Sequence, residues 1–223
     1  MIKQEYERNS KLYELLLKLD IPFISKFVLN KIYDTEFFLE GEKFKKDSAS
    51  KVAEIINEHV AFNSVFDVGC GMGIYLEEFH RLGKEAFGCD FSVEGLRITP
   101  KQFTAFQADA TKPITLNRKF DLLICFEVAE HIHKKYSKQL VTNCIRNSDT
   151  VLFTAAPVGQ GGVGHINEQP YEFWIDLFVE QGFALDNGLT EQMRAQMKKE
   201  NVVFWIANNL MLFHSVNPTF SER

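Results

Sequence analysis

The sequence has little of what marks metal-binding, membrane-spanning or nucleic-acid-binding proteins. Its 223 residues include only four cysteines, with no CxxC pair and no Cys/His spacing typical of a zinc site. No apolar run approaches the ~18 residues that a membrane-spanning helix needs. A net charge of −5 provides no broad basic surface for a phosphate backbone. We therefore expect no metal, no nucleic acid and no membrane, and a small molecule as the partner.

The small number of cysteines and the charged N-terminal residues indicate a reducing compartment. The N-terminal residues MIKQEYERNSK are charged and contain no apolar signal segment. Three of the four cysteines lie in or beside apolar strand patterns, so we expect reduced, buried thiols. These features predict a cytoplasmic protein, and they leave open whether it is a monomer or a homodimer.

Apolar strands and helices alternate regularly after residue 60. This rhythm predicts an α/β, Rossmann-like fold with a seven-stranded, mostly parallel sheet and helices on both faces. Residues 1–60 are helical in pattern, so we expect an N-terminal helical cap there and the α/β domain over residues 61–223. The expected strands are Ser64–Val68, Ala86–Cys89, Thr104–Gln107, Phe120–Phe126, Thr150–Ala155, Phe183–Leu185 and Asn209–Ser215.

The run Val65–Gly73 is the most informative segment. It predicts an apolar strand that ends in an acidic turn with three glycines at G-x-G-x-G spacing. Glycine has no Cβ and tolerates φ > 0, so a ligand can lie against bare backbone there. In the dinucleotide fingerprint, G-x-G-x-x-G, the third glycine falls where this chain has Ile74. The spacing therefore disfavours a nicotinamide-dependent oxidoreductase.

This turn resembles motif I of the class I S-adenosylmethionine-dependent methyltransferases of the small-molecule type. Cys89–Ser92 resembles motif II, Phe106–Ala110 motif III, and Phe120–Ile132 motif IV. The resemblance implies S-adenosylmethionine as the cofactor, with Asp90 on its ribose and Asp109 on its adenine. Two alternatives stay open, in which Asp90 caps the next helix and Asp109 is an ordinary turn residue. The cofactor-binding residues implied are Asp67, Gly69, Cys70, Gly71, Gly73, Asp90, Phe91, Asp109, Ala110, Phe126 and Glu127.

The acceptor side is expected in the glycine-rich stretch Thr154–Pro170, which follows the fifth strand. His165 is the first choice for a general base or acceptor-positioning group, and His131 is the second. Asn167 is expected to bind the acceptor, and Tyr33 of the helical cap to contact the acceptor or the methionine carboxylate. In the alternative interpretation, His165 and Asn167 cap the next helix and order the loop.

These features predict S-adenosylmethionine-dependent methyl transfer to a small-molecule acceptor, with O-methylation in a secondary-metabolite or glycan pathway favoured. The Asn/Asp-Pro-Pro-Tyr/Phe tetrapeptide of enzymes that methylate nucleic-acid amino groups is absent, and Phe126–Ala129 stands in its place. N-methylation of a small molecule and a non-catalytic cofactor-binding protein remain the alternatives.

Overall fold

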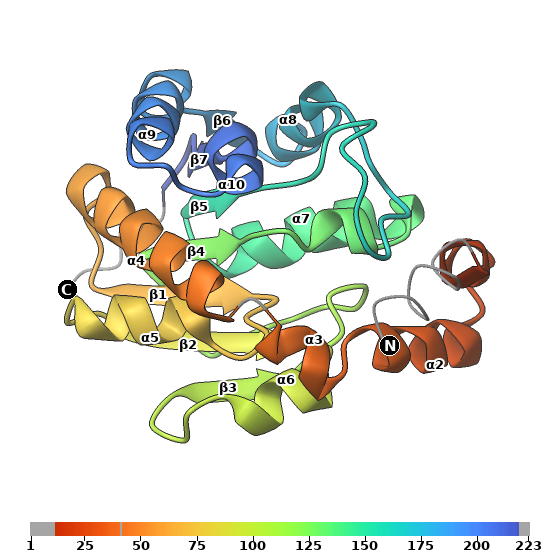
Figure 1. Ribbon diagram of the computed structural model, residues 1–223. Coiled ribbons are helices and arrows are strands. Elements are labelled where there is room, and N and C mark those ends of the chain that lie inside the picture. The colour runs from red at the N-terminus through yellow and green to blue at the C-terminus, as the bar shows by residue number, and fades with distance from the viewer. Residues whose placement is uncertain (1–11, 41, 219–223) are drawn as a thin grey trace.

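Seven strands form one sheet in the computed structural model, which describes residues 12–40 and 42–218 (Figure 1). Their order is β3-β2-β1-β4-β5-β7-β6. β7 runs antiparallel to β5 and β6, and the other pairings are parallel. The seven-stranded, mostly parallel sheet is therefore confirmed. The strands are β1 Ser64–Val68, β2 Glu85–Asp90, β3 Thr104–Gln107, β4 Leu122–Cys125, β5 Thr150–Phe153, β6 Phe183–Leu185 and β7 Met211–Ser215.

Helices precede the sheet in the chain and connect its strands. Residues 12–18 are helical. The helices that follow are α2 Pro22–Ile32, α3 Thr35–Leu39, α4 Glu42–His59, α5 Ile74–Arg81, α6 Val93–Ile98, α7 Ser137–Asn147, α8 Tyr171–Val179, α9 Asn187–Lys199 and α10 Phe204–Asn209. Two single 3₁₀ turns, η1 Ala129–His131 and η2 Lys134–Tyr136, precede α7. Among the described residues, no helix has the length and apolarity required to cross a bilayer.

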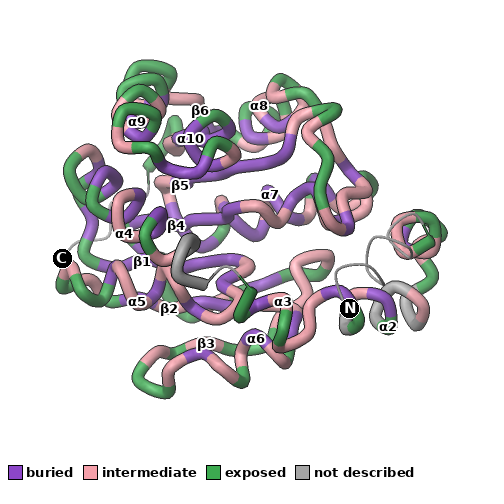
Figure 2. Tube along the Cα trace, viewed as in Figure 1, coloured by how far each residue is buried: buried purple, intermediate pink, exposed green. Residues whose placement is uncertain are grey.

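The two faces of the sheet bury separate apolar clusters, because side chains alternate along each strand. On β1, Val65 packs into the cluster with α4, α5 and α9, whereas Phe66 packs into the one with α7 and α8. All five β1 residues are buried, and the purple tube in Figure 2 marks this central strand as interior. Asp67 is two residues after Val65 and shares its face, so the fold buries a carboxylate.

The N-terminal helices pack against two different parts of the molecule. α4 contributes Val52 and Ile56 to the main core and packs against α5 and α9. The preceding helices pack instead on the glycine-rich loop, since Leu17, Val28 and Ile32 form an apolar cluster with Val163 and Ile166 of that loop. The division of the chain at residue 60 stays a prediction. In the structure, however, the part that lies over the loop ends before α4.

Several expected boundaries were wrong. The strand expected over Phe120–Phe126 is shorter, because Phe120 forms only an isolated bridge to Ser148 and the chain turns at Glu127. The strand expected from Asn209 begins at Met211, since Asn209 ends helix α10. That short, apolar helix has too few residues to show a helical period in the sequence.

Candidate functional site

The glycine turn after β1 is held by bonds to the end of β2. The amides of Gly69 and Cys70 both donate to the carbonyl of Cys89, at 2.7 and 3.0 Å. Gly69, Gly71 and Gly73 have φ of +89°, +53° and +81°, a region that favours glycine. The three glycines are therefore required by the path of the backbone, which brings the turn close to β2.

Asp90, at the end of β2, joins two turns. Its Oδ2 accepts the amide of Gly71 at 2.8 Å, and its Oδ1 accepts the amide of Ser92 at 2.6 Å. Burial raises the pKa of Asp90, and the amides of Ser92 and Gly71 oppose that rise. Each carboxylate oxygen can accept a second bond, so Asp90 can still receive two hydroxyl groups. Phe91 follows and accepts a bond from Gln107 through its carbonyl.

Asp67 lies beside an open space under the N-terminal helices. A cavity of about 220 Å³ is lined by Asp67, the glycine turn, Phe38, Tyr75 and Phe126. Asp67 is 2% exposed, and its Oδ2 has no hydrogen-bond partner among the described residues. Burial raises the pKa of this carboxyl, and the negative charge of Asp90 adds to the rise. A buried acceptor without a donor at a cavity wall fits a ligand that brings a positively charged donor.

Asp109 is occupied within its own turn. Its Oδ1 accepts the amide and the hydroxyl of Thr111 at 3.0 and 2.6 Å, and its Oδ2 pairs with Lys112 at 3.1 Å. Although partial burial would raise it, the bonds from Thr111 and Lys112 lower the pKa of Asp109. This geometry matches the alternative in which Asp109 is an ordinary turn residue, and its contact with adenine stays a prediction. Ala110 follows, and its carbonyl accepts a bond from Asn143.

The chain bends sharply where β4 ends. Glu127 has φ of +55°, uncommon for a residue with a side chain, and its amide donates to the Thr154 hydroxyl at 2.9 Å. The bend turns Glu127 inward, where burial raises the pKa of its carboxyl. Glu130, in η1, is fully buried, and burial followed by the charge of Glu127 raises its pKa well above the usual range. Strain and two buried carboxyls in one place indicate a functional site.

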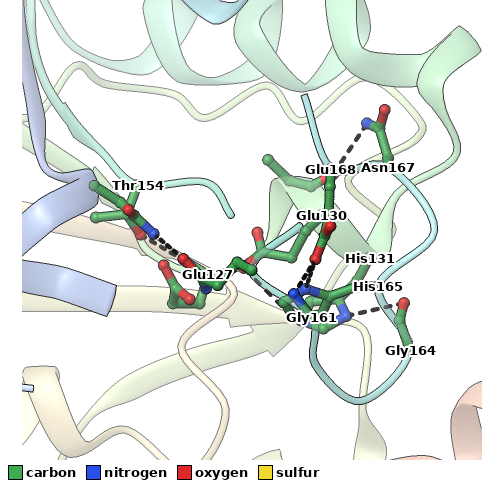
Figure 3. A network of polar contacts seen from close by, with 12 residues as sticks. Glu127, Glu130, His131, Thr154, Gly161, Gly164, His165, Asn167 and Glu168 are labelled. Atoms are coloured by element: carbon green, nitrogen blue, oxygen red, sulfur yellow. Dashed lines mark hydrogen bonds and ion pairs between the residues drawn. The ribbon is translucent and has the colours of Figure 1, made fainter. Parts of the chain in front are cut away.

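Two histidines lie next to these carboxyls. The rings of His131 and His165 are 5.0 Å apart, and Figure 3 shows both beside Glu130. His131 Nδ1 lies 3.2 Å from the carbonyl of Gly164, and since a carbonyl only accepts, the ring proton is on Nδ1. Burial lowers the pKa of His131 to about 3, and the charge of His165 adds to this effect. The imidazole of His131 is therefore neutral at physiological pH.

Glu168 fixes both His165 and the glycine-rich loop. Its Oε1 accepts from His165 Nδ1 at 3.0 Å and from the amide of Gly161 at 2.7 Å, and its Oε2 accepts the amide of Gly159 at 2.8 Å. Although burial alone would raise it, these bonds lower the pKa of Glu168. With Nδ1 bound to Glu168, His165 directs Nε2 inward, 4.0 Å from Glu130 Oε1.

The other two residues expected on the acceptor side lie in different surroundings. Asn167 is 1% exposed, and its Nδ2 donates to the carbonyl of Ala129 and the hydroxyl of Ser137. This is the loop-ordering geometry that the sequence left open, and contact with an acceptor stays a prediction. The ring of Tyr33 packs against His131, with 5.7 Å between centroids, so the N-terminal helices do reach the cluster.

A second cavity, of about 280 Å³, lies between the glycine-rich loop and the first described helix. His165, Glu168 and Gly162 line it together with Glu14 and Lys18 of the first described helix. His165 therefore stands between this cavity and the buried carboxyls. The first cavity includes Phe126, the residue before Glu127, so each cavity borders a residue in or next to the cluster.

Sequence reasoning found both histidines but missed the residues that surround them. Glu130 was passed over because a single acid in an apolar motif gives no sign of complete burial. Thr154 and Glu168 lie within the stretch Thr154–Pro170 that the sequence indicated, but their bonds to Glu127 and His165 are seen only in the folded chain. The strained turn at Glu127 also leaves no mark in the sequence, since no glycine stands there.

Comparison with known sequences gives a partial match. Residues 41–147 match the family described as Methyltransferase domain. A ubiquinone biosynthesis O-methyltransferase from Glaesserella parasuis serovar 5 is 30% identical over 103 residues, which are 40% of this chain and 43% of that protein. The matched region thus spans less than half the length of this relative.

Solved structures share the fold over a longer region. A sugar N-methyltransferase from Streptoalloteichus sp. superposes with a TM-score of 0.64 at 14% identity, covering 82% of this chain and 92% of that one. An amino pentose methyltransferase from Micromonospora echinaspora, solved with S-adenosylmethionine, gives 0.59 at 15% identity, covering 76% and 91%. At these identities the likeness establishes the fold, and the predicted Rossmann-like class is confirmed.

Proposed function

We propose that this chain, whose residues 41–147 match a methyltransferase domain, is a class I methyltransferase that methylates a hydroxyl group of a small molecule with S-adenosylmethionine. One observation carries the proposal. The glycine turn after β1 lies between two carboxylates. One is buried Asp67, whose Oδ2 has no hydrogen-bond partner among the described residues, and the other is Asp90, which accepts two backbone amides. Ligands bind at the carboxyl ends of parallel strands, and β1 is where the strand order reverses.

The residues at this turn fit the cofactor. Asp67 Oδ2 would accept from the ammonium group of the methionine part, and Asp90 would accept both ribose hydroxyls. Gly71 leaves backbone exposed to the ligand, and Phe38 would cover it from the N-terminal side, since a Cβ at Gly71 would lie 3.1 Å from the Phe38 ring. When bound, the cofactor supplies a methyl group already activated by a positively charged sulfur. The protein then has to position the acceptor, exclude water and accept one proton.

Transfer to oxygen is favoured over transfer to nitrogen by the groups beyond Phe126. A hydroxyl has to lose its proton, whereas a neutral amine already has a free electron pair. Glu127, Glu130, His131 and His165 place four proton-accepting side chains together at the end of β4. The O-methyltransferase named among the relatives supports the same choice.

N-methylation of an amino sugar is the second candidate. The two solved structures described above are a sugar N-methyltransferase and an amino pentose methyltransferase, and they cover most of this chain. An amine acceptor uses its own electron pair and loses its proton only after transfer, so it makes less demand on a general base.

Two measurements test the proposed function. Calorimetry with S-adenosylhomocysteine should give one binding event per chain, lost in Asp90→Ala. Methyl transfer from labelled S-adenosylmethionine to hydroxylated and aminated metabolites in extract fractions should then label an oxygen. Label on nitrogen would establish the second candidate, and cofactor binding without any labelled product would favour a non-catalytic protein.

A further inference from the structure

The cluster at the end of β4 has the composition of a metal site. One carboxylate oxygen of Glu130 and one ring nitrogen each of His131 and His165 lie within 4.8 Å of one another. Two histidines and one carboxylate form a common set for divalent first-row transition ions, and such a set leaves coordination positions open. We propose that Glu130, His131 and His165 bind one such cation. The proposal departs from the expectation of no metal, which rested on spacing along the chain.

The unpartnered state of Glu130 is an independent observation for a missing ligand. Its side chain is fully buried, and neither carboxylate oxygen has a partner that meets hydrogen-bond geometry among the described residues. Oε1 of Glu127 is also buried without a hydrogen-bond partner among the described residues. Two buried carboxylates in low dielectric require a compensating positive charge or a shared proton. Across the described residues, no lysine or arginine is paired with either of them.

The hydrogen bonds of the two imidazoles also match those of metal ligands. A metal-binding histidine usually donates its other ring N–H to a carbonyl or a carboxylate, which fixes the ring and leaves the ligating nitrogen unprotonated. His131 Nδ1 bonds to the Gly164 carbonyl, and His165 Nδ1 bonds to the Glu168 carboxylate. Both Nε2 atoms are thereby left for a cation.

The distances suit a single ion after a small adjustment. Two ligands bound at about 2.1 Å lie at most about 4.2 Å apart, and His165 Nε2 is 4.0 Å from Glu130 Oε1. Gly162 packs directly against the His165 ring, where a Cβ would collide with it. The loop therefore holds the imidazole in place, and a side-chain rotation of Glu130 would complete the site.

The cation deepens the proposed function, on which its chemical role rests. An acceptor hydroxyl that occupies an open position would become more acidic, because the cation stabilises the alkoxide. The oxygen then forms a bond to the methyl carbon, the sulfur–methyl bond breaks with its electron pair going to sulfur, and the hydroxyl proton goes to Glu127. This assigns the cluster to hydroxyl acceptors, above all those with a second oxygen that also reaches the cation.

Binding is tested without reference to activity. Full-length protein treated with a chelator should bind one Mn²⁺ per chain in calorimetry and one Co²⁺ with the absorption bands of a nitrogen- and oxygen-bound ion. Glu130→Gln and His165→Ala should abolish both signals. Glu168→Gln, which leaves all three ligands in place but weakens the contacts that orient His165 and the loop, should weaken Mn²⁺ binding by ~10–100-fold. His80→Ala, an exposed imidazole on α5, should bind as the wild type does.

The outcomes separate this inference from the proposed function. Protein that binds S-adenosylhomocysteine normally but takes up neither Mn²⁺ nor Co²⁺ would overturn the metal site and leave the methyltransferase proposal standing. Methyl transfer at full rate by chelator-treated protein would overturn the role of the cation and return proton removal to His165. Loss of transfer on chelation, restored by Mn²⁺ with cofactor affinity unchanged, supports both binding and role. Uptake of Mn²⁺ by protein that fails to bind the cofactor would uphold the site and reject the methyltransferase.

Discussion

His165 and Glu168 are joined by a 3.0 Å hydrogen bond between Nδ1 and Oε1. The same carboxylate binds the amides of Gly159 and Gly161, so one acidic side chain sets both the orientation of the imidazole and the course of the loop. Glu168 therefore binds two of the four glycine amides of this loop. The bonds that fold the loop are the same bonds that hold the His165 ring in place.

Removing the imidazole should affect turnover much more than cofactor binding. We expect His165→Ala to lower kcat by ~10²–10⁴-fold, because the variant loses either a ligand of the cation that acidifies the hydroxyl or the base that takes its proton. The dissociation constant for S-adenosylhomocysteine should stay within twofold of that of His80→Ala, which serves as control. Steady-state kinetics on the acceptor found in the labelling screen and calorimetry check the two values. Equal losses in both would mean that His165 only orders the loop.

Gly71 and Gly83 make a matched pair for testing the donor turn. Both have positive φ, at +53° and +76°, but a Cβ would lie 3.1 Å from the Phe38 ring at Gly71 and meet nothing at Gly83. Each change to alanine should lower the free energy of unfolding by ~1–2 kcal/mol through backbone strain. Only Gly71→Ala should also lose S-adenosylhomocysteine binding. Denaturant titration and calorimetry on both variants decide this, and normal binding by Gly71→Ala would refute a ligand at the turn.

Asp67 should reduce stability as the pH rises. Burial raises its pKa in the folded state, so the unfolded chain loses its proton first, near its usual pKa of ~3.9. The stability present below that pH is lost progressively as the pH rises toward the folded pKa. Asp67→Asn should therefore gain in free energy of unfolding over the wild type from acid to neutral pH, while binding S-adenosylhomocysteine more weakly. A pH-independent difference in urea unfolding between the two proteins would contradict this account.

Asn167 should matter for stability before it matters for chemistry. Its amide donates to the Ala129 carbonyl and the Ser137 hydroxyl in a buried position. Asn167→Ala leaves both acceptors without a donor, which should cost about 1–3 kcal/mol in the free energy of unfolding. The exposed Asn217 provides the control, since Asn217→Ala should change stability little. Thermal and urea unfolding measure both. If Asn167→Ala left stability unchanged and raised the KM for the acceptor, Asn167 would be an acceptor-binding residue and not a structural one.

The glycine turn, the proposed donor side, was readable from the sequence because its pattern is local. A strand, an acid and three glycines fall within nine consecutive residues, Val65–Gly73, and local backbone geometry gives them their meaning. The cluster proposed to face the acceptor draws on η1, the end of β5 and the loop after it, which lie far apart in the sequence. No periodicity links Glu130 to His165, so the sequence presented two separate histidines where the fold has a four-residue cluster.

The sequence by itself determined the alternation of strands and helices and the glycine turn, because hydrophobic period and the conformational freedom of glycine act over a few residues. Tertiary structure alone decided which polar groups are buried together. The strand order places β4 beside β1 and β5, and that order brings Glu127 and Thr154 into contact. Burial then removes water from Glu130 and His131, and that loss of solvent shifts their pKa values away from the usual range.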